Sequence, residues 1–156
     1  MKLNKNLILD VAEKFIIDKG FEKTTLSDIS KNLNVTHAAL YKYYQNKEDL
    51  FESLALRWLT ISMDNIFEWQ PVSSPNQDLH EWLWLLTTTK KDLYQSDSKM
   101  FFLYTRYIEQ NAKLVNNHLK NLAIKVEQID STQNGMAVIL AFTFFHNPYF
   151  SERWNS

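Results

Sequence analysis

Residues 20–47 read GFEKTTLSDISKNLNVTHAALYKYYQNK, and this stretch decides the fold. Its apolar and turn-forming positions predict two short helices separated by a tight bend at Asn34-Val35. Thr25 followed three residues later by Asp28 is a capping-box pattern that begins the first helix. Thr36 is a natural N-cap for the second helix, and Asn46 is one for a third helix that begins at Lys47. Two short helices joined so closely form a helix-turn-helix.

An amphipathic helix is expected just before this stretch, over residues 5 to 19. Its apolar residues repeat at spacings of three and four: Ile8, Val11, Ala12, Phe15 and Ile16. Gly20 follows at the position where a glycine with a positive φ usually closes a helix. The N-terminal part of the chain is therefore expected to be a compact, three-helix head.

The run from Ile8 to Leu50 resembles the DNA-binding domain of TetR-family transcriptional regulators. The ordered features that carry the resemblance are Gly20-Phe21, Thr24-Thr25, Ile29, Val35-Thr36, Leu40-Tyr41 and Lys47-Glu48-Asp49-Leu50. The resemblance implies an all-α protein with an N-terminal helix-turn-helix head joined to a helical body that binds an effector and pairs two subunits. Ala38 stands where the family often has Gly, and Tyr43-Tyr44 where it commonly has His-Phe. Alanine is still small enough for a close approach to DNA, and tyrosine has a hydroxyl group that can reach a phosphate. The two differences are therefore expected to preserve DNA binding.

The second helix of the motif has two distinct faces. At about 100° per residue, one arc holds four residues that are expected to face DNA, and Leu40 and Tyr44 lie on the arc that faces the core of the head. The DNA-facing residues are His37, Ala38, Tyr41 and Lys42. His37 can donate to a base edge, Lys42 to a base or a phosphate, and Ala38 permits a close approach to the groove.

A second set of residues is expected to contact the phosphate backbone, because it resembles the positions that do so in the family. The set is Thr25, Thr36, Tyr41, Tyr43 and Lys47. The alternative is that the tyrosines pack and the lysines are merely solvated. Basic and acidic residues balance in the whole chain, 17 against 18, so a strongly salt-driven, non-specific DNA binder is not expected. The predicted partner is a palindromic double-stranded operator.

After Leu50 the composition changes, because 17 of the 22 aromatic residues lie in residues 51–156. Periodicity predicts helices over residues 47–69, 77–95, 98–128 with a break near Asn111, and 132–146. Ser131-Thr132 is expected to begin the last of these helices, and Asn147-Pro148 to end it. The stretch from Pro71 to Pro75 reads as a loop. The expected division is a DNA-binding domain over residues 1–48 and an effector-binding and dimerisation domain over residues 49–156.

Ligand sites are mostly apolar with a few polar groups, which makes the aromatic body the expected place for a small apolar or aromatic effector. The candidate ligand-binding residues are Asn65, Trp82, Leu86, Phe102, Tyr104, Tyr107 and Glu109. Trp82 is preferred to Trp84 because it continues the stronger apolar stripe of its helix. The alternative is that this aromatic stripe is ordinary core.

Dimerisation is expected through the C-terminal helices. TetR-like regulators usually end with two helices that pair with those of the second subunit, but here residues 132–146 are followed only by a short stretch to Trp154. Either the sequence is cut short, or a homodimer forms through residues 132–154 with a smaller surface that includes Phe142, Phe145 and Trp154.

Several classes of protein are not supported. The chain has no cysteine, and its four histidines lack the spacing of a metal site, so we expect neither a disulfide, a metal nor a cofactor. A signal peptide and a membrane-spanning run are not seen, which predicts a cytoplasmic protein. An acid, base and nucleophile set is also missing, so an enzyme that uses the aromatic body as its cavity is the least supported hypothesis. The main alternative to a regulator is a helical protein-protein interaction module with no DNA target.

Overall fold

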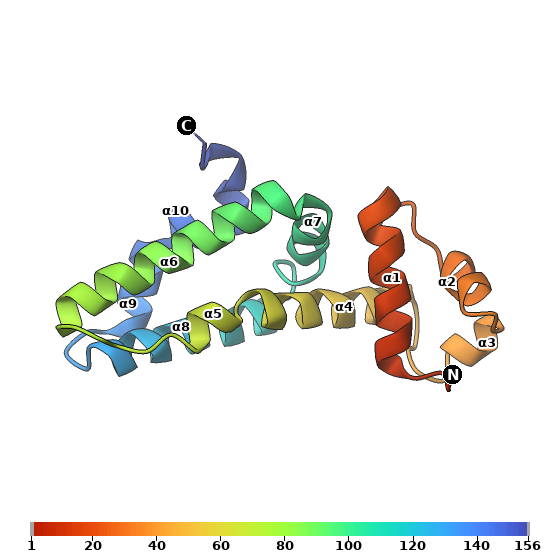
Figure 1. The fold of residues 1–156 in the computed structure, drawn as a ribbon, viewed down its shortest axis with the longest axis horizontal. Helices are drawn as coiled ribbons and strands as arrows, with labels where there is room; N and C mark the ends of the chain where they lie inside the picture. The colour runs from red at the N-terminus through yellow and green to blue at the C-terminus, as the bar shows by residue number, and fades with distance from the viewer. Residues whose placement is uncertain (1, 156) are drawn as a thin grey trace. The chain divides into compact units, whose positions relative to one another are not determined.

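The computed structural model describes residues 2–155, and every regular element in that range is a helix (Figure 1). The elements are α1 (Lys5–Lys19), α2 (Leu26–Asn32), α3 (His37–Leu40), α4 (Lys47–Ser62), α5 (Asp64–Phe67), α6 (Pro75–Ser96), α7 (Ser98–Tyr107), α8 (Ala112–Ile129), α9 (Gly135–Ala141), α10 (Thr143–His146) and the 3-10 helix η1 (Pro148–Arg153). The all-α class predicted from the sequence is confirmed. None of the helices in the described part of the chain is both long and apolar enough to cross a membrane.

The chain divides into two compact units, which we describe separately. The head unit comprises the residues up to Leu59 together with Lys99–Ile108, and the body unit comprises Thr60–Ser98 together with the residues from Glu109 onward. The head unit thus contains α7 in addition to α1, α2, α3 and most of α4. The functional boundary expected at residue 48 stays a prediction.

The helix starts in the head unit are fixed by local hydrogen bonds. Thr25 Oγ1 accepts from the N–H of Asp28 at 3.1 Å, and the Asp28 carboxylate accepts from the N–H of Thr25 at 2.8 Å, which confirms the capping box of α2. Thr36 caps α3 through the N–H of Ala39, and Asn46 accepts from the N–H of Asp49 at 2.7 Å at the start of α4. Asn34 makes the bend between α2 and α3 with φ 54°, a conformation that Asn tolerates better than most residues.

Helix α1 ends as predicted at Lys19, and Gly20 follows with a positive φ of 83°. Its ψ of 158° lies outside the left-handed helical region, so the closing conformation is more extended than that of the usual glycine cap. In the apolar stripe of α1, Ile8, Ala12 and Ile16 are completely buried. Helices α2 and α3 lie on the same side of α1, and α2 packs against both (Figure 1).

Helix α7 packs its aromatic side chains against α4 within the head unit. The ring of Trp58 lies 6.4 Å from that of Phe101, nearly perpendicular to it, and 5.9 Å from that of Tyr104. The Tyr107 ring makes edge contacts with Phe21 at 6.1 Å and with Phe51 at 5.9 Å. These contacts agree with the placement of most of α7 in the head unit.

Charged groups fasten α4 to α1 on the surface of the head unit. The guanidinium of Arg57 donates to the carboxylates of Asp10 and Glu13, each at 2.8 Å. Because Arg is planar, one side chain bridges two acidic residues that lie three positions apart on one face of α1. Arg57 therefore links α4 to two residues of α1.

The body unit departs from the predicted helix boundaries in four places. Helix α6 begins at Pro75 because proline is tolerated in the first helical turn, so the loop ends earlier than expected. The helix expected over residues 47–69 is interrupted at Met63, and the break near Asn111 is confirmed, with Asn111 capping α8. The helix expected over residues 132–146 begins later, at Gly135, and breaks at Phe142. Beyond Asn147-Pro148 the chain continues as η1.

The late start of α9 has a local cause. The carboxylate of Asp130 accepts from the N–H of Thr132 at 3.0 Å, from the hydroxyl of Thr132 at 2.7 Å and from the side-chain amide of Gln133. These bonds hold residues 130–133 in a turn. Asn134 then supplies the cap, because its side chain accepts from the N–H of Ala137 at 2.9 Å.

Candidate DNA-binding surface and effector-binding residues

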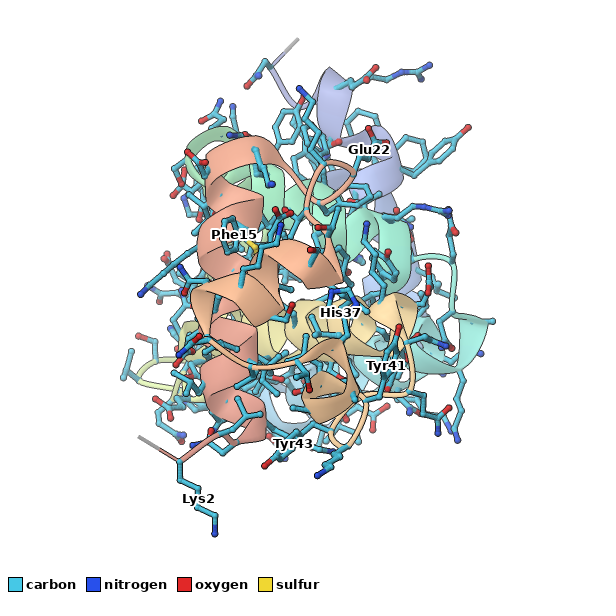
Figure 2. All side chains as sticks on the ribbon, turned by 90° about the vertical axis from the view of Figure 1, so that its right-hand side faces the viewer. Lys2, Phe15, Glu22, His37, Tyr41 and Tyr43 are labelled. Carbon is cyan, nitrogen blue, oxygen red and sulfur yellow. The ribbon has the colours of Figure 1, made fainter. Side chains whose placement is uncertain are left out.

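The predicted DNA-facing arc of the helix-turn-helix is exposed in the head unit. His37, Ala38, Tyr41 and Lys42 are all accessible to solvent, whereas Leu40 is 1% and Tyr44 5% exposed. Figure 2 shows His37 and Tyr41 on the outer side of the head. The predicted division between an outer and a core-facing arc is therefore confirmed, and the DNA contacts of these residues stay predictions.

Two buried side chains hold α3 in place beneath that arc. Leu40 lies in the core of the head, and the Tyr44 hydroxyl donates to the carbonyl of Lys5 at 3.3 Å. Burial raises the pKa of Tyr44, so this hydroxyl keeps its proton at neutral pH. Helix α3 is only four residues long, and its exposed residues are positioned by this packing more than by helical length.

Tyr43 has an additional partner that the sequence did not indicate. Its hydroxyl donates to the carbonyl oxygen of Leu3 at 2.8 Å, and Figure 2 places Tyr43 and Lys2 at the same end of the head. A phosphate oxygen is an acceptor, so Tyr43 can donate to it only after the bond to Leu3 breaks. The exposed hydroxyl of Tyr41 is the better placed of the two for the predicted phosphate contact.

The side chain of Thr25 already forms hydrogen bonds at the start of α2. Its hydroxyl donates to the Asp28 carboxylate at 2.8 Å, and the Lys19 ammonium donates to the same oxygen at 2.8 Å. The Lys19 bond, followed by the bonds from Thr25, holds the pKa of Asp28 well below its usual range. The carboxylate is thus charged and paired, and its negative charge is partly neutralised beside the predicted contact at Thr25.

Lys47 stands at the first position of α4. Its ammonium lies 5.1 Å from the centre of the Phe51 ring, which is a cation-π distance, and its side chain remains half-buried. Other lysines of the head are exposed, namely Lys23, Lys31 and Lys42. Thr36 is exposed as well, although its oxygen is used as the cap of α3.

The seven predicted ligand-binding residues are divided between the two units. Asn65, Trp82, Leu86 and Glu109 belong to the body unit, and Phe102, Tyr104 and Tyr107 belong to the head unit. Trp82 and Leu86 are completely buried, and Trp82 Nε1 donates to the carbonyl of Ile66 at 2.9 Å. Phe102 is 50% exposed whereas Tyr104 is 1% exposed, and the Asn65 amide donates to Thr89 at 3.1 Å. Their ligand contacts stay predictions.

An open cavity of about 320 Å³ lies on the outer side of α6 in the body unit, and none of the seven residues lines it. Its lining is Trp84, Thr87, Thr88, Lys91, Phe144, Phe145, Arg153 and Trp154. Trp84, which is 65% exposed, thus points away from the buried Trp82, as their spacing on the helix predicts.

Residues 8–54 match the model of "Bacterial regulatory proteins, tetR family". Over these residues, which are less than a third of the chain, the protein is similar to the DNA-binding domains of that family. The same region is 45% identical over 47 residues to the biofilm operon icaADBC HTH-type negative transcriptional regulator IcaR of Staphylococcus epidermidis, a match that covers 30% of this chain and 25% of IcaR. The IcaR of Staphylococcus aureus strain Newman is 38% identical over 48 residues, 31% of this chain and 26% of that protein. The match spans about a quarter of these curated relatives.

Solved structures extend the likeness beyond the TetR head to the fold of the whole chain. The fatty acid degradation regulator FadR from Bacillus halodurans has a TM-score of 0.67 at 18% identity, and the alignment covers 97% of this chain and 85% of FadR. A TetR-like transcriptional regulator from Rhodococcus sp. RHA1 has a TM-score of 0.61 at 18% identity over 97% of this chain and 86% of that chain. At these identities the comparison shows the fold alone.

A group of buried basic residues in the body unit was not expected from the sequence. Lys90 is 2% exposed, His146 is 3% exposed, and the ring atom Nε2 of His118 is shielded from solvent. One signal was available, because Lys90 follows Trp82 and Leu86 at four-residue steps and so lies on their apolar face. A lysine normally reads as a surface residue, which hid this placement.

Proposed function

We propose that the protein is a sequence-specific transcriptional regulator, a repressor that a small apolar or aromatic effector releases from a palindromic operator. One observation carries the proposal: a TetR-family head presents an exposed face of His37, Ala38, Tyr41 and Lys42 above the buried Leu40 and Tyr44. A regulator of this kind works in the cytoplasm, where its DNA lies, and catalyses no reaction.

A gel-shift assay tests the DNA-binding part of the proposal. The probe is DNA from beside the protein's own gene, with a scrambled fragment of equal length as competitor. We expect a complex that resists the competitor and that Tyr41→Ala weakens, whereas Lys120→Ala, a change at an exposed lysine of α8, leaves it intact. If the native and scrambled fragments bind equally, the alternative of an interaction module with no DNA target takes its place.

We further propose that two copies pair through residues 132–154. Large apolar side chains remain exposed there: Leu140 at 53%, Phe144 at 39% and Phe145 at 48%. A palindromic site requires a two-fold symmetric protein, which an apolar surface on each copy can provide. Sedimentation should give a dimer at micromolar concentration that Phe145→Glu dissociates and Ile61→Glu, at another exposed apolar position, does not. A monomer, or a dimer joined through the head, contradicts this assembly.

Effector release is assigned to the region of Trp82. The bond from Trp82 to Ile66 ties α6 to α5, which directly follows α4 along the chain. An effector that displaces this indole frees the C-terminal end of the long helical segment that begins in the head. Binding energy that differs between the two arrangements then changes the DNA affinity.

Trp82→Phe is the appropriate variant for this test, because Trp82→Ala leaves a large cavity in a completely buried site. Phenylalanine keeps most of the volume and removes the N–H. We expect DNA binding without effector to persist and effector-induced release to weaken, and Trp84→Phe serves as the exposed control. Normal release from the Trp82→Phe variant would place the coupling elsewhere.

A further inference from the structure

Three backbone carbonyls near the start of the chain accept hydrogen bonds from side chains far along the head unit. The bonds run from Tyr43 to Leu3 at 2.8 Å, from Tyr44 to Lys5 at 3.3 Å and from Arg57 to Asn6 at 3.4 Å. Each of them joins positions at least 39 residues apart in the sequence. Residues 3–6 are therefore held in place by tertiary contacts of the head and not by helical hydrogen bonds alone.

The bond from Tyr43 differs from the other two because it reaches a residue before α1. Leu3 precedes Asn4, the N-cap, and so lies outside the hydrogen bonds of the helix. Asn4 accepts from the N–H of Leu7 at 2.9 Å, and its amide donates to the carbonyl of Lys2 at 3.4 Å. The Tyr43 hydroxyl thus fastens the segment before α1 to the turn that follows α3.

This first segment of the chain is positively charged. Residues 2–9 include Lys2 and Lys5 and no acidic residue, although the whole chain has a formal net charge of −1. Both lysines are exposed. The Lys5 ammonium lies 5.6 Å from the centre of the Tyr44 ring, whereas the Lys2 ammonium has no hydrogen-bond or ion-pair partner within residues 2–155. Lys2 can therefore accept an anionic partner without giving up another contact.

Lys2 lies at the edge of the predicted DNA-facing side of the head. Figure 2 looks onto the side that carries His37 and Tyr41, with Lys2 and Tyr43 at one end of it, and the Lys2 side chain extends outward there. When a recognition helix enters the major groove, the ends of the surface around it meet the sugar-phosphate strands that border the groove. A lysine at such an end is placed for a phosphate more than for a base.

We propose that Lys2 binds a backbone phosphate of the operator and that Tyr43 is the residue that positions it, through the bond to Leu3. In this arrangement the Tyr43 hydroxyl acts without touching DNA, unlike the direct phosphate contact expected from the sequence. Both roles rest on the proposed function, because they require that the exposed face of the head bind DNA.

Fluorescence anisotropy with the full chain and the DNA fragment from beside its gene tests the role of Lys2. Lys2→Ala should lower the slope of log affinity against log salt by about one, because one charge that neutralises a phosphate is lost. Lys2→Arg keeps that charge and should restore the slope. Lys120→Ala, at an exposed lysine of α8, is the control and should leave the slope unchanged. An unchanged slope in Lys2→Ala overturns the proposal.

Tyr43→Phe tests the positioning role, because it removes only a hydroxyl group and no charge. If Tyr43 positions Lys2, this uncharged change should lower the salt slope by about half or more of the Lys2→Ala effect. The double variant should then bind no more weakly than Lys2→Ala alone. A hydroxyl that itself donates to phosphate predicts the opposite: the slope persists and the two losses add. That result overturns the positioning role.

The free protein gives a second measure of the same bond. Tyr43→Phe loosens Leu3 and Asn4, so exchange of the Leu7 amide, which Asn4 accepts, should become about fivefold faster. Tyr149→Phe, at a tyrosine that is 83% exposed, is the matched control and should change neither this exchange nor the salt slope. Circular dichroism checks that both variants fold. Equal exchange in the two variants overturns the positioning role.

The wild-type protein separates this inference from the proposed function. If it does not prefer the native fragment to a scrambled one, the proposed function fails and the DNA contact of Lys2 fails with it. If it prefers the native fragment and Lys2→Ala keeps the full salt slope, only the inference is rejected and the regulator stands.

Discussion

The ammonium of Lys99, in the first turn of α7, lies 2.7 Å from the carbonyl oxygen of Ile17 near the end of α1. It donates to the carbonyl of Asp18 as well, also at 2.7 Å. The last carbonyls of a helix lack partners within the helix, and a positive charge is favourable at that end. A residue more than eighty positions away along the sequence therefore completes the C-terminal end of α1 inside the head unit.

Lys99→Met should loosen the last turn of α1 without unfolding the head. The change removes two charge-assisted bonds at an exposed site, worth about 1 kcal/mol together after screening by solvent. Amide hydrogen exchange of Lys19 and Gly20 should become about fivefold faster, because local opening costs less by that amount. Lys14→Met, at an exposed lysine of the same helix, should leave the exchange of these amides unchanged. Equal exchange in both variants would show that the Lys99 bonds contribute nothing in solution.

Lys47→Ala should weaken the binding of every DNA sequence to a similar extent. The predicted contact is to a phosphate, which carries no sequence information, so the slope of log affinity against log salt should fall by about one. Binding measured by fluorescence anisotropy at several salt concentrations checks this, with Lys120→Ala as the control. An unchanged salt slope contradicts the phosphate contact.

His37→Ala should instead change which DNA sequences are preferred. Loss of a hydrogen bond to a base edge costs about 1–3 kcal/mol at the position that is read and little at the others. Competition with a set of single-base operator variants measures this, and discrimination should be lost at one position per half-site. Uniform weakening across the whole set would instead make His37 a backbone contact.

The helix-turn-helix could be predicted because its determinants are local. Thr25 with Asp28, Thr36 with Ala39 and Asn46 with Asp49 are bonds within three residues, and such short-range patterns are written directly in the sequence. The exposed arc of α3 could be predicted in the same way, because helical spacing places Leu40 and Tyr44 on a different side from the exposed residues. The body offered fewer such signals, and four of its predicted helix boundaries were wrong or were shifted.

What the sequence could not provide depends on contacts between distant segments. Phe102 and Tyr104 are both aromatic and two residues apart, yet one is half exposed and the other buried, because Tyr104 faces Trp58 of α4. Periodicity identifies a face but not the element that covers it. The burial of Lys90 was hidden for the same reason, since it depends on the packing of other segments against α6.

Gly135→Ala should destabilise the body unit strongly. A Cβ atom at this position would lie 2.1 Å from the carbonyl oxygen of Ala123, where α9 packs against α8, and the backbone atoms there cannot move independently. We expect a loss of about 2–3 kcal/mol in the free energy of unfolding, measured with urea. Ala137→Ser, at an exposed position of α9, should change it by less than about 0.5 kcal/mol. A stable Gly135→Ala variant would mean that the two helices do not pack this closely.

Lys90→Met should stabilise the protein, and by an amount that depends on pH. In the folded state the pKa of Lys90 is lowered to about 8 from 10.5. Between these two pH values the unfolded chain binds more protons than the folded protein. The free energy of unfolding of the wild type therefore increases as the pH rises through this range. Below about pH 8 the cost of the buried charge is fully present, and the variant should be more stable by about 1–3 kcal/mol. Its advantage should shrink as the pH approaches 10.

The comparison with the variant is needed because other groups of the protein titrate as well. Protonation of His118 and His146, whose pKa values are lowered mainly by burial, reduces stability below about pH 6.5. In the variant, Glu109 also loses its interaction with the charge of Lys90. Ionisation of Tyr44 and Tyr107, whose pKa values are raised, reduces stability above about pH 10. Urea unfolding of both proteins at pH 7, 8, 9 and 10 isolates the Lys90 contribution as their difference. A difference that stays constant over this range, or a variant that is less stable at pH 7, would show that burial does not lower the pKa of Lys90.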